Sequence, residues 1–541
     1  MRTASRAFFV SVLLLAVPML GCGDDGSGPG GGGGGSADGG SGGSTSNGST
    51  NPEISSVTAP TRTTVRVALT FAPDAIPDAG KYYELTSDFG PLTVESAELD
   101  ASGPAIVLTT DPQKLGVEYH LVIKQPGNAL DFQSGTFLSA DTATFWASDF
   151  GDPNFAPYEV NASRAAIGQH VVIYLADGID ASDVDDTVAF FDEQIFPKET
   201  ALFTDAPDRD ENGKVLLLGL DGGGYYGGYF DPTNSLTEAQ AQQFGQHSNE
   251  LEMLYISIPD LQGSFDPTQV VAHEFQHLLY NETHDYADGD WSWHNEGLAE
   301  CAVGAVSGTN PVATYYYTEP DSGLATGQSL VNWTFSNYSQ YAQAYVFWTY
   351  VASRLGGLDG YGQIFQETGK PSDMDAFFQA KLGETFAEVQ MDMLVATVRR
   401  EATGPLGFEG LVDFTAPTLT VPAGTTSLAL GPFTGVLFPV ATDGLTPSGQ
   451  GPNVLHVGVP TVGALDVVAP FDVAGGVVIA LNANQSTNGS DESSGTLGAG
   501  VAGPSPVPLL PSLGPTWKHP PPLRPDDRSA VKEWRRLTAG F

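Results

Sequence analysis

Two histidines and a glutamate lie together in the segment 266–281, and they could hold and use a metal ion. His273 and His277 are four residues apart in the sequence Asp-Pro-Thr-Gln-Val-Val-Ala-His-Glu-Phe-Gln-His-Leu-Leu-Tyr-Asn. On a helix this spacing places both imidazoles on one face, where they can bind the same zinc ion. Glu274 lies beside them and is placed to take a proton from a water molecule as general base. The segment therefore predicts a catalytic zinc site.

The residues around this motif favour a helix. Asp266 is a suitable N-cap, Pro267 suits the first helical position, and Gln269 completes a capping-box pattern. Helix breakers are lacking until Asn281. We therefore expect a helix of roughly 14 residues.

A catalytic zinc site takes three protein ligands and leaves the fourth position to water. The segment Trp-His-Asn-Glu-Gly-Leu-Ala-Glu at 293–300 offers Glu296, which follows His277 after 18 intervening residues. That distance allows a turn and the start of an antiparallel second helix. Glu300, one turn further on, would face the same way and hold the free ring nitrogen of His273. Small residues would let the second helix approach the first closely: Ala299, Ala302, Gly304 and Ala305.

Two other segments are predicted to contribute to the reaction. The aromatic segment Tyr341–Val351 predicts a helix, and Tyr341 is our candidate to stabilise the oxyanion, with Tyr345 as the alternative. The segment Asn249–Ile258 predicts a strand that leads toward the metal helix. An edge strand there could pair with an extended peptide substrate; the other interpretation is an ordinary member of the sheet.

A second metal site is suggested by oxygen-bearing residues. Asp208, Asp210 and Asn212 have the spacing of a calcium loop. The closing glutamate of an EF-hand is missing, because Gly219 stands at the twelfth position. A polar turn built on Asn-Gly is the competing interpretation.

The composition limits the partners. The 541 residues include 64 Asp and Glu against 22 Lys and Arg, which gives a formal net charge of −42. This balance argues against nucleic acid and anionic lipid headgroups as partners. We expect a monomer that acts on protein or peptide substrates. Cys301, inside the second metal-site helix, is expected to be a small buried thiol.

The N-terminus has the features of an export signal. Arg2 and Arg6 precede the apolar run Phe8–Leu20, which is too short to span a bilayer and is typical of a signal peptide. The run ends in Met-Leu-Gly-Cys, which resembles the lipobox of bacterial lipoproteins. This predicts a lipid on Cys22 as the sole membrane attachment, at the bacterial outer surface or in the periplasm. Because Met replaces the preferred Leu of the lipobox, cleavage and secretion without a lipid is the alternative.

The pattern along the chain predicts a multidomain protein: an α+β zincin-like metallopeptidase core flanked by β-sandwich accessory domains. Its predicted parts are a signal peptide at 1–21, a Gly/Ser-rich tether at 22–52, a β-sandwich resembling bacterial Ig-like domains at 53–140, a zinc metallopeptidase domain at 141–405, a C-terminal β domain at 406–500, and a disordered Pro/Arg-rich tail at 501–541.

The central region resembles the hyicolysin-like family of zinc metallopeptidases, within the gluzincin group. The resemblance is carried by His-Glu-Phe-Gln-His-Leu at 273–278 and Asn-Glu-Gly-Leu-Ala-Glu at 295–300. Supporting matches are Asp-Glu-Asn-Gly-Lys-Val at 210–215, Gly-Gly-Tyr-Phe-Asp at 227–231 and Ser-Asn-Glu-Leu-Glu-Met at 248–253. The resemblance covers about half of the chain.

This resemblance implies roles for individual residues. It makes His273, His277 and Glu296 the zinc ligands, Glu274 the general base, and Glu300 a supporting carboxylate. The family usually has Ser where Ala299 stands, and this departure touches no ligand.

The sequence thus predicts a secreted or surface-anchored zinc metalloendopeptidase. The alternative is a non-catalytic surface adhesin or carbohydrate-binding protein with a structural metal site. That alternative requires a fourth protein ligand to close the site, and His294 is the candidate near the motif.

Overall fold

The structure is a computed structural model. It describes residues 11–13, 51–78, 81–152, 155–265, 267–284, 291–318, 324, 327–333, 338–412, 427–448, 453–461, 463–467, 469–484 and 493–497. Most of the predicted signal peptide, Cys22, most of the tether, Asp266 and the tail at 501–541 lie outside the described residues.

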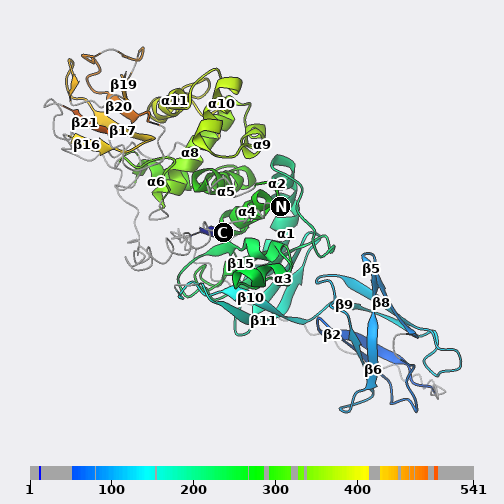
Figure 1. Cartoon of the computed structure of the whole chain (residues 1–541). Helices are drawn as coiled ribbons and strands as arrows, with labels where there is room; N and C mark the ends of the chain where they lie inside the picture. Colours follow the sequence, from blue (N-terminus) through cyan, green and yellow to red (C-terminus); the bar gives the residue numbers. More distant parts are fainter. Residues whose placement is uncertain are drawn as a thin grey trace, which may run out of the picture. The chain divides into compact units, whose positions relative to one another are not determined.

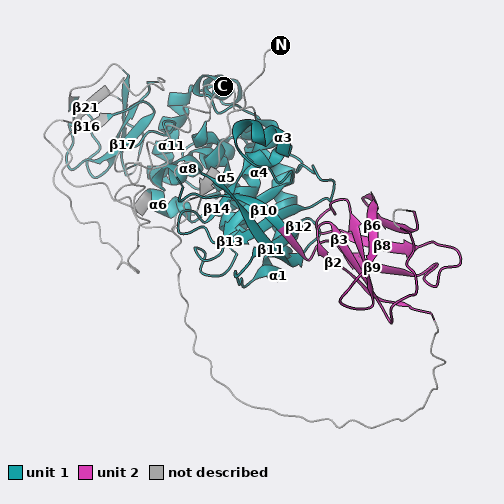
Figure 2. Ribbon diagram, turned by 60° about the horizontal axis from the view of Figure 1, so that its bottom comes forward, with its two compact units in different colours: residues 1–15, 144–513, 519–541 teal, residues 16–143, 514–518 magenta. Residues whose placement is uncertain are grey.

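The chain divides into two compact units, which Figure 2 shows in different colours. The described part of the first unit comprises 11–13 and the residues from Thr144 onward, and that of the second comprises 51–143. The metal-site motifs all belong to the first unit.

The second unit consists of two four-stranded antiparallel sheets, in the strand orders β2-β3-β7-β6 and β5-β4-β8-β9. In the strands the side chains alternate between buried and exposed, as in β3 (Thr64–Leu69), and the buried ones of both sheets form one core. The other strands are β2 (Ile54–Thr61), β4 (Tyr83–Ser87), β5 (Gly90–Leu92), β6 (Val94–Leu99), β7 (Ala105–Thr110), β8 (Glu118–Ile123) and β9 (Ser134–Leu138).

The first unit is built on a seven-stranded mixed sheet in the order β1-β14-β15-β13-β12-β11-β10. Its centre, β12, β13 and β15, is parallel, while β11 runs antiparallel to β12 and β14 antiparallel to β15. The strands are β1 (Ser11–Leu13), β10 (Thr142–Ser148), β11 (Pro157–Ile167), β12 (Val171–Ala176), β13 (Val215–Leu220), β14 (Gly228–Phe230) and β15 (Met253–Ser257).

The predicted metal helix is present, with a different start. A π-helical turn, η4 (Pro267–Val271), leads into α4 (Ala272–Thr283), so the regular helix begins one residue before His273. The second predicted helix is α5 (Ser292–Ser307). Phe275 and Leu279 of α4 share one core with Leu217 of β13 and Leu254 of β15, which fixes α4 against the sheet (Figure 1).

Of the two interpretations of the segment 249–258, the structure confirms the ordinary member of the sheet and contradicts the edge strand. The segment at 249–258 contributes β15, which lies inside the sheet between β13 and β14. On this side of the sheet β14 pairs antiparallel with β15 and, on its other side, with β1. The short strand β1 is thus the outermost strand. Hydrophobicity alone does not distinguish the two positions, because strands in both are fully buried here.

Further helices surround the helix pair in the first unit. The helix α8 (Ser339–Arg354) covers the predicted aromatic segment and packs against α5. Gly304 of α5 lies against Tyr345 of α8, 3.1 Å from the place of an added Cβ, so this small residue serves the contact with α8 and not the one with α4. The remaining helices are α1 (Val184–Phe190), η1 (Phe191–Ile195), α2 (Phe196–Leu202), η2 (Pro232–Ser235), α3 (Glu238–Ala241), η3 (Gln242–Phe244), α6 (Val312–Thr318), α9 (Asp359–Phe365), α10 (Pro371–Lys381) and α11 (Phe386–Arg399).

The strands after residue 412 belong to the same unit as the metal-site helices. They form two three-stranded sheets. Phe433 and Leu437 contribute to the core that contains the helices, and Gln390 of α11 donates a hydrogen bond to the carbonyl of Phe433 at 2.9 Å. The strands are β16 (Ser427–Leu430), β17 (Thr434–Pro439), β18 (Pro447–Ser448), β19 (Val454–Val459), β20 (Val477–Asn482) and β21 (Ser493–Leu497).

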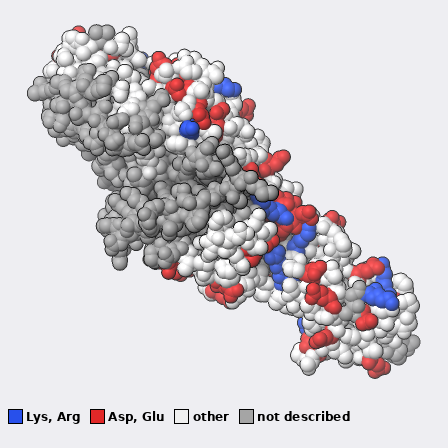
Figure 3. Space-filling view, viewed as in Figure 1, with Lys and Arg blue, Asp and Glu red and all other residues white. Residues whose placement is uncertain are grey.

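Acidic and basic side chains are scattered over the described surface in the view of Figure 3. Among the described residues, no helix combines the length and apolar character needed to cross a bilayer.

Candidate metal centre

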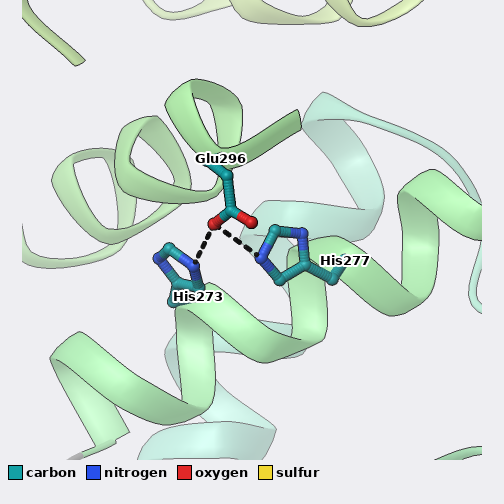
Figure 4. Close-up of side chains that lie close together, drawn as sticks. All are labelled: His273, His277 and Glu296. Carbon is teal, nitrogen blue, oxygen red and sulfur yellow. Dashed lines mark hydrogen bonds and ion pairs between the residues drawn. The ribbon is translucent and has the colours of Figure 1, made fainter. Parts of the chain in front are cut away.

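The three predicted zinc ligands come together between α4 and α5 (Figure 4). His273 and His277 point from successive turns of α4 toward Glu296 of α5. The Nε2 atoms of the two imidazoles lie 3.3 Å and 3.4 Å from the same carboxylate oxygen, Oε2 of Glu296. All three side chains are at most 2 % exposed. We call these three residues the zinc cluster.

The spacing of the donor atoms fits a zinc ion. Bonds from zinc to imidazole nitrogen and carboxylate oxygen are about 2.0–2.2 Å long, and in a tetrahedron of that size the donors are about 3.3–3.5 Å apart. The two measured separations, 3.3 Å and 3.4 Å, agree with this edge length. Two imidazoles and one carboxylate are also a donor set that zinc prefers.

Neighbouring side chains fix which ring nitrogen of each histidine faces the cluster. Nδ1 of His277 donates to Oδ1 of Asn295 at 2.9 Å, which leaves Nε2 to present its lone pair to a metal ion. Nδ1 of His273 lies 3.5 Å from Oε1 of Glu300, at ion-pair distance. Such partners orient metal-binding imidazoles and raise their basicity. The predicted contact between Glu300 and the second ring nitrogen of His273 is therefore present in the structure.

Glu300 is itself held in place by Asn310. The side-chain amide of Asn310 donates to Oε2 of Glu300 at 2.6 Å and to the backbone carbonyl of Glu300 at 2.9 Å. The residue thus ties the carboxylate to the backbone of its own helix. Asn310 thus holds Glu300, and Glu300 in turn contacts His273.

The charges of the cluster are strongly coupled. Burial alone lowers the pKa of His273, but the hydrogen bonds with Glu296 and Glu300 outweigh it and raise the pKa to about 10. Burial alone raises the pKa of Glu296, but His277 and His273 outweigh it and lower the pKa to about 2. The carboxylate is therefore ionised at neutral pH.

Glu274 lies beside the cluster, against β14. Its side chain is fully buried, and burial raises its pKa well above the ordinary value, with a further contribution from the negative charge of Glu296 and opposition from His273. A Cβ atom on Gly228 of β14 would lie 3.1 Å from Cγ of Glu274 and 2.6 Å from Val270. The glycine thus lets the helix that carries Glu274 lie directly against β14.

The two candidate tyrosines have different surroundings. The ring of Tyr341 lies 6.3 Å from the ring of His273. Its pKa is raised well above 10 by burial and by the charges of Glu296 and Glu300, which places it beside the cluster. The hydroxyl of Tyr345 instead accepts from the N–H of Asn310 at 3.3 Å. The alternative candidate, Tyr345, is thus bound to a backbone group away from the ligand atoms.

His294, the candidate fourth ligand, is engaged elsewhere. Its Nε2 donates to the carbonyl of Ile364 at 3.0 Å, and its Nδ1 accepts from the hydroxyl of Tyr280 at 2.8 Å. Burial lowers its pKa to about 3, so the imidazole is neutral with both nitrogens occupied. Within the described residues, the group of donors around Glu296 therefore has three members.

The predicted calcium residues lie in the loop before β13, outside the group of donors around Glu296. Asp208 and Asp210 approach each other, and the structure adds Glu252 to them. The side-chain amide of Asn212 donates to Oδ2 of Asp210 at 2.9 Å, so Asn212 also contacts this group of carboxylates.

Some functional positions were missed in the sequence. Asn295 contacts His277, and Asn310 contacts Glu300. Gly228 allows the close contact of β14 with Glu274. Glu252 lies close to the carboxylates of Asp208 and Asp210. A signal existed for Asn295, since it directly precedes the ligand Glu296 on the same helix. Gly228 and Glu252 lie in the segments 227–231 and 248–253 that support the family resemblance, whereas only the tertiary structure identifies Asn310.

Comparison with known proteins gives distant likenesses. No protein family model matches the chain, and no curated protein matches it, so the resemblance to the hyicolysin-like family remains a prediction. Among solved structures, yeast LTA4 hydrolase in complex with bestatin matches with a TM-score of 0.24 and 12 % identity over 64 % of each chain. The N-terminal part of the bacterial S-layer protein SbsC matches with a TM-score of 0.16 and 21 % identity, over 19 % of this chain and 27 % of that one.

In each of these matches the aligned region spans less than two thirds of the other protein's length. The similarity is too low to establish a common fold. Functional conclusions therefore rest on the geometry of the site itself.

Proposed function

We propose that the chain is a zinc metalloendopeptidase. The observation that carries the proposal is the triangle of His273, His277 and Glu296, whose donor atoms have the spacing of zinc ligands. A zinc ion held there would polarise the carbonyl of a peptide bond and lower the pKa of a water molecule. The protein's own part in the reaction is assigned to Glu274 and Tyr341.

Glu274 is the proposed general base and acid. It would take the proton of the attacking water and pass it to the leaving amine. The support for this role is that the charges of His273 and Glu296 both act on its carboxyl group. The charge of a bound dication would favour the ionised form, against the burial that raises the pKa of Glu274.

Tyr341 is the proposed donor to the oxyanion. Its ring is close to His273, and burial keeps the hydroxyl protonated because its pKa is raised well above 10. A neutral hydroxyl can donate a hydrogen bond to the negative charge that develops on the carbonyl oxygen. Removal of one such donor from an enzyme costs about 3 kcal/mol of transition-state stabilisation.

The outer side of β14 is the proposed place for the substrate. In the structure this edge takes up β1 as an antiparallel strand, in the register Ser11 to Phe230 and Leu13 to Gly228. An extended peptide on the same edge would pass beside Glu274, which lies against Gly228. This mode of binding uses backbone hydrogen bonds, so it suits protein and peptide substrates of varied sequence.

The proposed location is outside the cytoplasm, as a lipoprotein anchored through Cys22 or as a secreted protein. The support is the export signal at 1–21 and the motif that ends in Cys22. The alternative function, an adhesin with a closed structural metal site, has less support. Its required fourth ligand, His294, has both ring nitrogens occupied.

The decisive test is the substitution Glu274→Gln. The variant should keep about one zinc per chain by elemental analysis, because the ligands are intact, and lose casein cleavage by about 10²–10⁴-fold. The chelator 1,10-phenanthroline should abolish cleavage by the unaltered protein. A variant that binds zinc and still cleaves casein would refute the role of Glu274.

A matched control is Glu282→Gln on the same helix. Glu282 lies near the end of α4, and its side chain pairs with Arg209 instead of the zinc cluster. This variant should keep both zinc and cleavage. A loss of cleavage equal to that of Glu274→Gln would show that any change of charge on α4 disables the protein.

A further inference from the structure

The loop before β13 has the backbone conformation of a calcium loop. Oδ1 of Asp208 accepts hydrogen bonds from the N–H groups of Asn212 at 2.8 Å and Gly213 at 3.0 Å. Gly213 has a φ of 70°, a conformation that glycine adopts readily. Asp208, Asp210 and Asn212 thus take the first, third and fifth positions of the loop, and Gly213 takes the sixth, where calcium loops need glycine.

The order of strands in the sheet brings a carboxylate from another segment to this loop, in place of the glutamate that is missing at the twelfth position. The twelfth position, Gly219, lies within β13 and is buried in the sheet. Beside it, β15 runs parallel to β13 in the register Leu216 to Met253. The amino ends of both strands therefore meet at one edge, and the residue before β15 is Glu252. Its carbonyl accepts from the N–H of Leu216 at 2.8 Å.

Glu252 brings a buried carboxylate with an unused oxygen to this loop. Its side chain is 1 % exposed. Its Oε1 accepts from the N–H of Arg209 at 2.5 Å, while Oε2 has no hydrogen-bond partner in the part of the chain that the structure describes. A buried carboxylate oxygen without a partner is costly. A cation at this place would remove that cost.

The geometry points to a Ca²⁺ ion bound by Asp208, Asp210 and Glu252. Carboxylate oxygens of the three acidic residues lie within 4.8 Å of one another. Oxygens that share a Ca²⁺ ion are bonded to it at about 2.3–2.6 Å and lie up to about 5 Å apart. A donor set of oxygens alone in a flexible loop suits Ca²⁺ better than Mg²⁺, which demands a tighter octahedron.

The calcium ion would stabilise the fold and would take no part in the hydrolysis. It would join the amino ends of β13 and β15, which carry the loop and Glu252. The guanidinium of Arg209 in the same loop pairs with Glu282 of α4. The loop is thus in contact with the end of the helix that bears His273 and His277.

Calcium binding can be measured on the full-length protein that carries Glu274→Gln, which prevents self-cleavage. Titration of CaCl₂ into calcium-depleted protein with its zinc in place should show one binding event by calorimetry. Millimolar calcium should raise Tm by several degrees, as expected for a ligand present at about ten times its Kd. Magnesium at the same concentration should give a much smaller shift. An equal shift with magnesium, or no binding of calcium at millimolar concentration, would overturn the proposal.

The additional change Glu252→Gln tests the ligand set. It removes a charge without changing the shape, and it should weaken calcium binding at least about tenfold and abolish the rise in Tm. Glu211→Gln, in the same loop but outside the three-carboxylate group, is the matched control and should retain both. Undiminished binding by the Glu252 variant would overturn the assignment. Should that variant fail to fold, Asp210→Asn decides by the same two measurements.

Discussion

The zinc cluster and the carboxylate cluster of Asp208, Asp210 and Glu252 lie in the same unit but are built differently. The zinc cluster takes all its members from two packed helices, and its side chains are at most 2 % exposed. The carboxylate cluster takes two of its members from an exposed loop and one from the interior. The first therefore presents its donors on two helices, and the second has an exposed side and a buried side.

The difference matches what each ion demands. Zinc requires a tetrahedron of short bonds, and each imidazole of the cluster is oriented by another side chain, Asn295 or Glu300. Calcium tolerates a longer and more irregular shell, and the loop that offers Asp208 is held by hydrogen bonds from the N–H groups of Asn212 and Gly213 to the Asp208 carboxylate. We infer that the zinc cluster serves the chemistry and the carboxylate cluster serves stability.

The largest expected effect is the loss of zinc on Glu296→Ala. In the proposed site three ligands would hold the ion, and removal of one would leave two imidazoles, too few for a stable site. Zinc content by elemental analysis should fall from about one per chain to near zero, and casein cleavage should fall to background. Unchanged zinc content would show that Glu296 is not a ligand, and the contrast between the clusters would fail.

A smaller effect is expected from Asn295→Ala. The substitution removes the acceptor that orients Nδ1 of His277. Loss of such a partner typically costs about 10–100-fold in metal affinity or activity. Competition with a chelating indicator would measure the zinc affinity. Asn295→Asp keeps an acceptor oxygen and should restore most of the affinity; failure of this rescue would assign Asn295 a purely packing role.

The zinc affinity should also rise with pH. In the metal-free protein the pKa of His273 is raised to about 10, so the imidazole holds a proton at neutral pH that the metal must displace. Each unit of pH below about 10 should change the affinity about tenfold. The same shift stabilises the metal-free fold below the ordinary pKa of 6.5, and this contribution is lost as the pH approaches 10. Affinities that are equal at about pH 6 and pH 8 would contradict this coupling.

The two clusters also differ in what the sequence reveals. The zinc ligands His273 and His277 are predictable because helical spacing alone brings them together, and Glu296 follows once a second helix is assumed. Glu252 is not predictable in this way, because it meets Asp208 through the order of strands in the sheet. The order of strands also explains why the segment 249–258 does not form an edge strand. Whether β15 lies at the edge depends on its pairing with β14, which the sequence pattern does not reveal.

The smallest expected effect on the chemistry is that of Glu252→Gln in the otherwise unaltered protein. Because Glu252 touches the loop and not the zinc cluster, the variant should keep about one zinc per chain, and its cleavage rate at 25 °C should change less than about threefold. Its half-life at elevated temperature should shorten, because a ligand that binds only the folded state no longer stabilises it. Zinc content and residual casein cleavage after heating measure these outcomes separately. A loss of zinc would show that the two clusters depend on each other, and that the division between chemistry and stability is wrong.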